Sequence, residues 1–274
     1  MQKLNDSVKS RGVVVFAFNT SLIDYVKIAD RTSRLISQHL QLPITLITDV
    51  DSAPVFAYDQ IVRIDTSGST FRNTTDYQLQ QWRNFDRYLA YELSPYQETI
   101  LIDTDYLVLD NSLLKLFDTQ FDYRLMHHSK NLYVPMPEEM GAVGLPFVWA
   151  TVVLFRRTER SRLFFNLIGR IQRNYNYYSL LYHIRDGNYR NDYAFAIANN
   201  ILNGYSLNED QGIPWTMLTI EKPIERITLT DNFVQVFQKD HATVIPYQNI
   251  HIMDKDYLQS QDFEQVVGAI CEPA

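Results

Sequence analysis

The chain has 274 residues, 46% of them hydrophobic, which is enough to bury a sizeable core in one large α/β domain or two small ones. The formal net charge of -7 argues against a general basic surface for nucleic acid, and the single cysteine, Cys271, excludes an intramolecular disulfide and a cysteine zinc cluster. We find no apolar run of the roughly eighteen residues that a membrane span needs and no signal-peptide core, so no integral membrane segment and a cytoplasmic location are expected.

Strand and helix patterns alternate in the first part of the chain. A β-branched and aromatic run predicts a buried strand at 13–18, and helical spacing predicts a helix over 25–40 that Asp24 caps. Short apolar runs followed by polar residues predict strands at 44–47 and 61–64. Strand, helix and strand in this order are typical of a parallel sheet.

The next segment continues this alternation. Residues 65–78 are polar and predict a loop that could close on a ligand. Apolar residues at helical spacing then predict a helix over 79–93. A short aliphatic run predicts another buried strand at 99–102.

Beyond residue 110 the predicted elements are mixed. Strands are predicted at 123–127, 147–155, 227–229, 234–237 and 244–245. Helices are predicted at 113–117, 161–175, 192–202 and 261–270, with Ser161 and Asp192 as possible N-terminal caps. Proline and glycine interrupt 131–146, which indicates a surface loop over a site.

Several arginines lie close together between residues 156 and 173. We interpret them first as the solvated face and entry of a helix, with an anion site as the alternative. These arginines are Arg156, Arg157, Arg160, Arg162, Arg170 and Arg173.

An acidic pair, Asp103 and Asp105, directly follows the strand predicted at 99–102. In an extended segment residues i and i+2 project to the same side, so both carboxylates can reach one point beyond the strand. Open α/β sheets bind ligands at this end of their strands, and carboxylates suit a hard divalent cation. An Asp-x-Asp pair is also common by chance, so the pattern alone does not establish a metal site.

Several short motifs follow one another in a characteristic order from about residue 13 to 255. They are AFNT at 17–20, the predicted helix around Arg87, LIDTDYLVLD at 101–110, WATVVLF at 149–155, NDYAFAIA at 191–198 and HIMDK at 251–255. Their order and spacing resemble the GT-A glycosyltransferases that use nucleotide sugars, and more narrowly the glycogenin-like group of family eight. The resemblance implies an α/β fold of GT-A type, with a Rossmann-like, mainly parallel central sheet flanked by helices and a mixed C-terminal half.

The same resemblance implies one domain over residues 1–274. A nucleotide-binding half would span about 11–110, and an acceptor half with a C-terminal metal-binding segment would span about 111–274. The sequence shows no internal repeat and no linker that would divide it otherwise.

The resemblance also implies a metal site. Asp103, Asp105 and His251 would bind Mn²⁺ or Mg²⁺ together with the donor diphosphate, and an imidazole ligand favours Mn²⁺. A divalent ion offsets the charge that develops on a leaving diphosphate. The alternative for His251 is a surface loop residue. Lys255 is similar to a lysine that contacts the diphosphate, although the residues around it differ from the group's usual glycine, proline and tryptophan.

Further donor contacts follow from the resemblance. Ala17, Asn19 and Thr20 would hold the base or ribose, and Asp49 is another candidate for this role. Tyr25 would stack on the base or, alternatively, be a core aromatic. Thr104, between the two aspartates, is also expected to contact the donor.

Two residues are the catalytic candidates. Arg87 would touch the donor sugar and the acidic pair, with a salt bridge to that pair or to Glu92 as the structural alternative and Arg83 as a substitute. Asp192 would face the donor sugar and the reacting carbon, with a helix cap as the compatible alternative and Asn191 as a second candidate.

Two local features limit the assignment. Trp149 stands where the group often has a smaller residue near the sugar, so the donor sugar stays open. His127 and His128 are adjacent and point to opposite faces of a strand, so we interpret them as structural or acceptor-side residues rather than metal ligands.

These features together predict a divalent-metal-dependent glycosyltransferase. It would move a sugar from a nucleotide diphosphate sugar, with a UDP-sugar favoured, to a hydroxyl acceptor with retention of configuration. The acceptor could be a glycan, a lipid-linked sugar, a protein or a modified base in DNA. A nucleotidyltransferase of similar fold would normally carry a glycine-rich loop after the first strand, which FAFNTSLIDY lacks. A non-catalytic nucleotide-sugar-binding protein is the third possibility.

Overall fold

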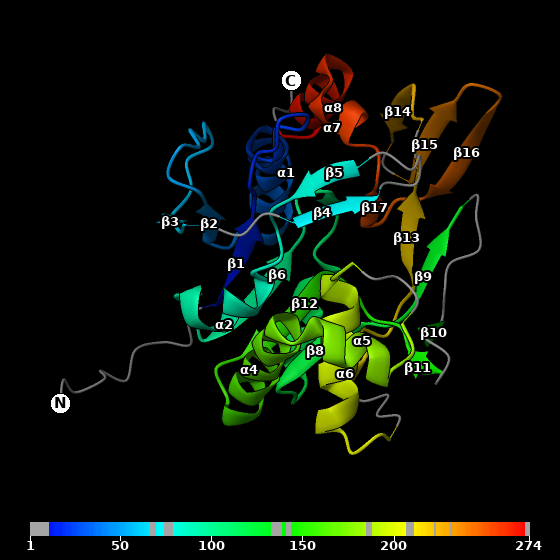
Figure 1. The fold of residues 1–274 in the computed structure, drawn as a ribbon. Coiled ribbons are helices and arrows are strands. Elements are labelled where there is room, and N and C mark those ends of the chain that lie inside the picture. The colour runs from blue at the N-terminus through cyan, green and yellow to red at the C-terminus, as the bar shows by residue number, and fades with distance from the viewer. Residues whose placement is uncertain are drawn as a thin grey trace.

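The fold is that of a computed structural model, which describes residues 11–65, 70–73, 79–132, 139–140, 144–184, 188–206, 211–221, 223–230 and 232–271. Six strands form the central sheet in the order β3-β2-β1-β6-β12-β8 (Figure 1). They are β1 (Arg11–Phe16), β2 (Ile44–Thr48), β3 (Gln60–Arg63), β6 (Glu98–Ile102), β8 (Tyr123–Met126) and β12 (Trp149–Arg156). Strands β3, β2, β1 and β6 are parallel, whereas β12 runs antiparallel to both β6 and β8. The predicted α/β class with a mainly parallel sheet is confirmed.

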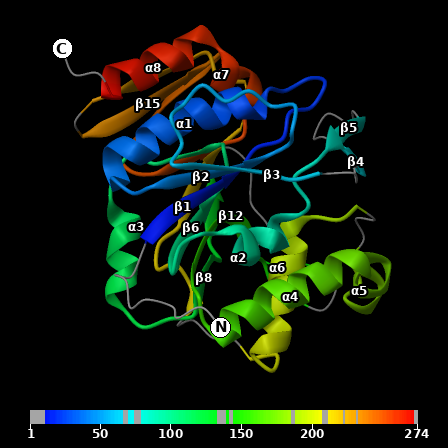
Figure 2. The same ribbon diagram turned by 90° about the vertical axis from the view of Figure 1, so that its left-hand side faces the viewer.

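Helices cover both faces of this sheet (Figure 2). On one side lies α1 (Tyr25–Leu40), and α7 (Lys255–Gln259) and α8 (Gln261–Cys271) pack on top of it. On the other side lie α2 (Ala90–Leu93), α4 (Glu159–Arg173) and α6 (Asn191–Leu202), with α5 (Tyr175–Leu181) at the edge. Short helical turns are η1 (Arg87–Leu89), α3 (Ser112–Lys115) and η2 (Leu116–Asp118).

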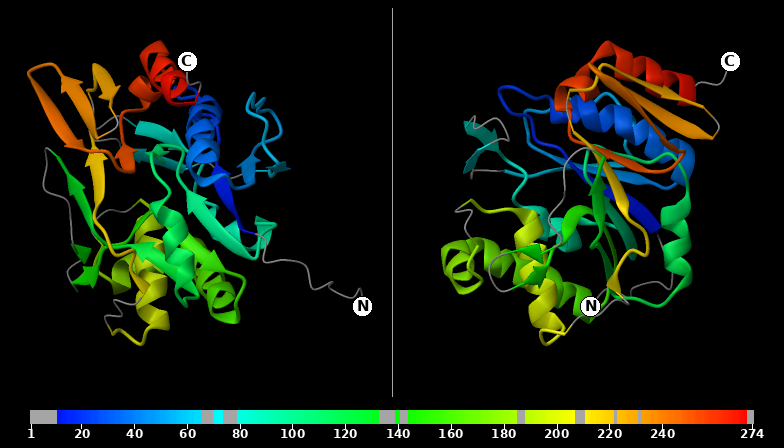
Figure 3. Two further views of the ribbon diagram at one scale, coloured as in Figure 1. Left: turned by 180° about the vertical axis from the view of Figure 1, so that it is seen from behind. Right: turned by 90° about the vertical axis from the view of Figure 1, so that its right-hand side faces the viewer.

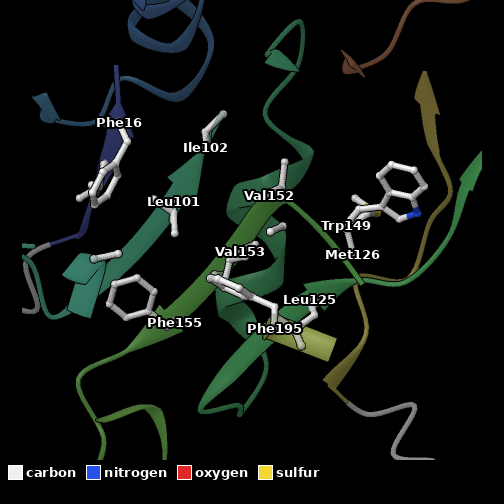
Figure 4. Close-up of a cluster of buried hydrophobic side chains, with 14 of the residues drawn as sticks. Phe16, Leu101, Ile102, Leu125, Met126, Trp149, Val152, Val153, Phe155 and Phe195 are labelled. Atoms are coloured by element: carbon white, nitrogen blue, oxygen red, sulfur yellow. The ribbon is translucent and has the colours of Figure 1, made fainter. Parts of the chain in front are cut away.

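The core lies between the sheet and the helices. Leu101 of β6 and Val153 of β12 are fully buried, and Phe195 of α6 packs in the same cluster (Figure 4). Both faces of β6 are covered, because every residue from Glu98 to Ile102 is buried. A continuous apolar run is what such a doubly covered strand requires, and this is why its local sequence predicted it correctly.

Smaller sheets, formed mainly by the second half of the chain, lie beside the central sheet (Figure 3). One has the order β7-β17-β13-β9, formed by β7 (Tyr106–Leu107), β17 (Ile250–Ile252), β13 (Met217–Ile220) and β9 (Ser129–Asn131). Another contains β14 (Arg226–Leu229), β15 (Phe233–Gln238) and β16 (His241–Pro246), and β14 packs against α8. Two hairpins are β4 (Thr70–Asn73) with β5 (Leu79–Trp82), and β10 (Glu139–Met140) with β11 (Leu145–Pro146).

The helix predicted over 79–93 is wrong in its first half. Residues Leu79–Trp82 form β5, whose backbone pairs with β4, and helical structure starts only at Arg87. Hydrophobic spacing over so short a segment does not distinguish helix from strand, and the pairing with β4 decides the outcome.

Two predicted caps are also wrong. Helix α4 begins at Glu159, and the Oγ1 of Thr158, rather than Ser161, accepts a hydrogen bond from the backbone at the start of the helix. Helix α6 has no side-chain cap, and the Asp192 carboxylate bonds elsewhere. In contrast, Asp24 caps α1 as predicted, because its carboxylate accepts a hydrogen bond from the Lys27 amide at 2.9 Å.

Both predicted long loops lie partly outside the described residues. Within 65–78 the described part forms β4, and within 131–146 it includes β10 and β11. Among the helices of the described residues, none is both long enough and apolar enough to cross a membrane.

Candidate functional site

The acidic pair lies in a tight turn at the carboxyl end of β6. The Asp103 amide donates to the carbonyl of Thr151 on the neighbouring strand at 2.9 Å, and the Tyr106 amide donates back to the carbonyl of Asp103 at 3.1 Å. The chain then enters β7. This turn holds the segment Asp103–Asp105 at the edge of the sheet where the parallel strands end.

The pairing of β7 with β17 brings His251 to the acidic pair. His251 lies opposite Tyr106 in the antiparallel register, and the Ile252 amide donates to the carbonyl of Asp105 at 2.9 Å. The His251 Nε2 lies 3.3 Å from an Asp105 carboxylate oxygen. On its other side the His251 Nδ1 lies 3.3 Å from the Oγ1 of Thr219. The hydroxyl contact fixes the ring orientation and turns Nε2 toward the pair.

Lys255 forms an ion pair with Asp105. It is the first residue of α7, and the Asp254 carboxylate caps this helix by accepting a hydrogen bond from the Tyr257 amide at 3.0 Å. The second Asp254 oxygen accepts from the Ile224 amide at 2.8 Å. The residue before Lys255, which departs from the family-eight pattern, therefore has a structural role in fixing the turn that presents the lysine.

Arg87 forms an ion pair with Asp103. Its side chain is buried on η1, and its Nε and Nη2 have no hydrogen-bond partner among the residues that the structure describes. The salt bridge considered from the sequence thus goes to the acidic pair. A buried guanidinium with unused donors is a strong anion-binding group.

The two carboxylates have opposite pKa shifts. Burial raises the pKa of Asp103, although Arg87 opposes this effect. Burial also disfavours the charged form of Asp105, but the Lys255 ammonium and His251 outweigh it and hold the pKa of Asp105 below its ordinary value. Asp105 is therefore the firmly ionised member of the pair.

Asp192, near the start of α6, lines the same cavity as the acidic pair. Its carboxylate accepts hydrogen bonds from the Ala150 amide at 2.9 Å and from Arg190 at 3.0 Å. The neighbouring Asn191 donates to the carbonyl of Asn84 at 2.7 Å. These contacts fix the start of α6 against β12 and against the segment that precedes Arg87.

A cavity of about 140 Å³ unites these groups. Its lining includes the acidic residues Asp103, Asp105 and Asp192, together with Arg87, His251 and Lys255. Tyr25 and Thr104 also belong to the lining, together with Trp149, Ala150 and Thr151 of β12. The sequence therefore identified residues that lie far apart in the chain and share one cavity.

Four predicted donor contacts do not line this cavity, namely Ala17, Asn19, Thr20 and Asp49. The Asn19 side chain accepts from the Val26 amide at 2.9 Å, and the Thr20 hydroxyl accepts from the Ile23 amide at 3.1 Å. These two side chains stabilise the turn into α1. Asp49 forms an ion pair with Arg83 at 2.9 Å, and Arg83 also donates to the carbonyl of Asn19 at 3.0 Å. Arg83 lines the cavity and connects these loops to its rim.

Other cavity residues were not identified from the sequence as site residues. They are Phe16, Phe18, Asn84, Arg190 and Met253. The position of Arg190 directly before the NDYAFAIA motif is the one signal that pointed to it. His127 and His128 lie after the end of β8 and do not line the cavity.

The donor atoms fit a divalent cation in their chemical kind. Two carboxylates and an imidazole line one cavity, and such ligands suit Mn²⁺ or Mg²⁺. Within the described residues, however, no three His, Cys, Asp or Glu side chains are grouped closely enough to hold a metal ion. Arg87 and Lys255 engage the two carboxylates in this arrangement. Lys255 sits on a flexible stem, so its ammonium can leave Asp105 without a change of backbone.

No protein-family model matches the chain, and no curated protein matches it. Among solved structures, the chain is similar to the glycosyltransferase GlyE of Streptococcus pneumoniae TIGR4, with 14% identity and a TM-score of 0.42 over 76% of this chain and 46% of GlyE. The chain thus spans less than half the length of that protein. It is also similar to an active-site mutant of LgtC, with 16% identity and a TM-score of 0.45 over 68% of this chain and 69% of LgtC.

A third similar structure is mouse xyloside xylosyltransferase 1, with 12% identity and a TM-score of 0.43 over 72% of this chain and 83% of that protein. At these values the likeness is remote. A function for this chain therefore has to follow from the chemistry of its own cavity.

Proposed function

We propose that the chain is a glycosyltransferase that transfers a sugar from a nucleotide diphosphate sugar to a hydroxyl acceptor. The observation that carries the proposal is the convergence of Asp103, Asp105, His251 and Lys255 in one cavity, with Arg87 and Asp192 facing the same space. Such a set combines carboxylates and an imidazole for a cation with two cationic side chains for a diphosphate. A UDP-sugar is the favoured donor, in keeping with the resemblance of the motifs to family eight.

A divalent ion, Mn²⁺ or Mg²⁺, is part of the proposal, with Asp103, Asp105 and His251 as its ligands. When bound, the ion would supply positive charge to the leaving diphosphate. Thr219 supports this role of His251, because its hydroxyl lies beside Nδ1 and leaves Nε2 directed at Asp105.

Lys255 and Arg87 stabilise negative charge at the proposed reaction centre. Lys255 exchanges its contact with Asp105 for the diphosphate when the donor enters. Arg87 stays with Asp103, and its remaining N–H groups are available to donor oxygens after a small rotation of the guanidinium. Preorganised cations in a buried cavity act strongly because little water screens them.

Asp192 orients the donor sugar. Its carboxylate is fixed by the Ala150 amide and by Arg190, so it presents acceptor atoms at a defined place beside Trp149. Tyr25 forms the base-side wall of the cavity, and Thr104 contributes at the diphosphate. Asn19, Thr20 and Ala17 act through the backbone of their turn, and Asp49 acts through Arg83, in positioning the base and ribose.

The proposal includes retention of the anomeric configuration and leaves the hydroxyl acceptor as a glycan, a lipid-linked sugar, a protein or a modified base in DNA. NMR of the product anomer distinguishes retention from inversion. A nucleotidyltransferase would instead release pyrophosphate from a nucleoside triphosphate in the presence of a sugar phosphate, so the same protein preparation tests both reactions.

Hydrolysis of the donor in the absence of acceptor tests the proposed function. A panel of UDP-sugars is incubated with the protein and Mn²⁺, and the released UDP is measured. Asp103→Asn should lower the rate about a hundredfold or more, since it removes a charge at the reaction centre. The matched control is Asp118→Asn, an exposed aspartate on η2, which should hydrolyse at the rate of the wild type. Absence of both metal-dependent binding and hydrolysis for every nucleotide sugar tested would refute the proposal.

A further inference from the structure

Helix α5 carries aromatic or aliphatic side chains on its buried face and also on its exposed face, where they lie beside the exposed Asn176. Tyr175 and Tyr178 of α5, and Tyr182 directly after it, are buried against the rest of the protein. The opposite face carries Tyr177, Leu180 and Leu181, which are 63%, 78% and 49% exposed. The exposed face of α5 therefore lacks a covering partner within the described part of the chain. Large apolar side chains that gather on one exposed face often mark an interaction surface.

A second exposed aromatic residue extends this surface. Tyr205 follows α6, is 64% exposed, and its hydroxyl lies 3.0 Å from that of Tyr182. We define the α5 patch as Tyr177, Leu180, Leu181 and Tyr205. Figure 2 shows α5 at the periphery of the molecule, next to the end of α4.

The charge around the α5 patch is opposite in sign to that of the chain as a whole. The 28 residues from 159 to 186 contain five arginines against Glu159 and Asp186, a net charge of +3, although the net charge of the protein is -7. Not all of these arginines face outward. Arg160 is half-buried and donates to Asn203 at 2.7 Å, whereas Arg162 is exposed and forms an ion pair with Glu159. The exposed arginines at the end of α4 next to α5 are Arg170 and Arg173.

We propose that the α5 patch docks on the surface of a lipid bilayer that contains anionic lipids. Exposed leucine and tyrosine side chains enter the boundary between headgroups and acyl chains, where amphipathic tyrosine is favoured. Arg170 and Arg173 contact the anionic headgroups beside them. A protein partner with an apolar surface would not require the local basic charge, so the bilayer accounts for both observations.

The α5 patch is connected to the cavity by a short series of contacts. The ring of Tyr175 packs edge-on against that of Tyr189 at 5.3 Å between centroids. The Tyr189 hydroxyl donates to the Asn191 side chain at 3.2 Å, and Asn191 lines the cavity. In the proposed docking, these contacts link the cavity to the helix at the membrane surface. The acceptor would then be a hydroxyl carried at that surface, such as that of a lipid-linked sugar. This consequence rests on the proposed function, whereas membrane docking itself does not.

Co-sedimentation with vesicles tests the docking in the absence of any nucleotide sugar. The protein should bind vesicles with about 30% phosphatidylglycerol in phosphatidylcholine and not vesicles of phosphatidylcholine alone. Binding should weaken as sodium chloride rises from about 0.05 to about 0.5 M, because salt screens the arginine contacts. Lack of binding to the anionic vesicles at low salt would overturn the proposal.

Variants identify the surface that binds. Leu180→Glu should weaken binding about tenfold or more, since it replaces an inserted leucine by a charge. Arg170→Gln should weaken it about fivefold, the effect of one basic residue near an anionic surface. The control is Val244→Glu on β16, where valine is 57% exposed outside the α5 patch, and it should bind as the wild type does. An equal loss in Val244→Glu would overturn the assignment of the surface.

Two further measurements separate membrane docking from misfolding and from self-association. Leu180→Glu should keep the melting temperature and the donor hydrolysis rate of the wild type, because its side chain is exposed and lies outside the cavity lining. Sedimentation velocity without vesicles should show the same oligomeric state for the wild type and for Leu180→Glu. A dimer that this variant dissociates would mean that a second copy of the chain covers the α5 patch, and the proposal would be wrong.

Discussion

Replacement of Arg87 by methionine tests the electrostatic description of the cavity. The guanidinium is buried and forms an ion pair with Asp103, whose side chain is 25% exposed. Arg87→Met keeps much of the side-chain volume and leaves the Asp103 carboxylate without its cationic partner. Loss of one member of a buried pair costs about 3–5 kcal/mol, and the partial exposure of Asp103 places the expected loss at about 3 kcal/mol. For a chain of this size, that lowers the melting temperature by about 6–12 °C.

The loss should depend on pH in a defined direction. Burial raises the pKa of Asp103 and Arg87 opposes this effect, so Arg87→Met raises that pKa further. A carboxyl whose folded pKa lies above its unfolded value binds protons more tightly in the folded state. The pKa of Asp103 is about 6 in the wild type, so the loss relative to the wild type is smallest below that pH. It grows as the pH rises from there to the higher pKa of the variant.

Urea unfolding followed by circular dichroism, at about pH 5 and about pH 8, measures this loss relative to the wild type. The matched control is the double variant Arg87→Met with Asp103→Asn, which removes the unpaired charge and should recover much of the stability at the higher pH. A single variant that loses less than about 1 kcal/mol, or a double variant no more stable than the single one, would refute the description of this pair as buried and mutually dependent.

Three further predictions concern the elements around the cavity. Lys255→Met should bind Mn²⁺ more tightly in calorimetry, because Lys255 no longer occupies Asp105, and yet hydrolyse the donor at least about tenfold more slowly; a parallel decrease of both would contradict the proposed exchange. Asp254→Ala should lower the free energy of unfolding by about 1–2 kcal/mol through loss of the α7 cap, as measured in urea, and an unchanged value would show that the cap is dispensable. Gly12→Ala should lower the free energy of unfolding by about 2 kcal/mol, because a Cβ on this residue would lie 2.4 Å from the Tyr96 ring. The control is Gly268→Ala in α8, which should be neutral or stabilising because the nearest atom to its Cβ would be 4.0 Å away. Similar free energies of unfolding for the two variants would contradict the packing around Gly12.

The sequence identified strands that are buried on both faces because their physical signal is local. In β6 and β12 the apolar run itself reflects the cover on each side, and neither strand needed knowledge of its neighbours to be predicted. Helix α1 was equally predictable from the sequence, since a single stripe of apolar residues and the Asp24 cap define it. The conformation of Leu79–Trp82 was not predictable in this way, because pairing with β4 decides it.

The site divides in the same way. The kind and position of its acidic residues, Asp103 and Asp105 at the end of a buried strand, follow from local pattern. The pairing of His251 with Asp105 was an expectation from family resemblance, and in the structure it depends on the register between β7 and β17. No local periodicity encodes that register.

What the sequence by itself determined is thus the alternation of strands and helices, the acidic turn and the chemical types of the candidate residues. Only the tertiary structure decided that Arg87 and Lys255 neutralise the two carboxylates, that Asp192 binds the Ala150 amide instead of capping its helix, and that α5 keeps an apolar face exposed. The physical reason is that charge pairing, desolvation and surface exposure depend on neighbours distant in the chain, whereas periodicity and capping depend on neighbours within a few residues.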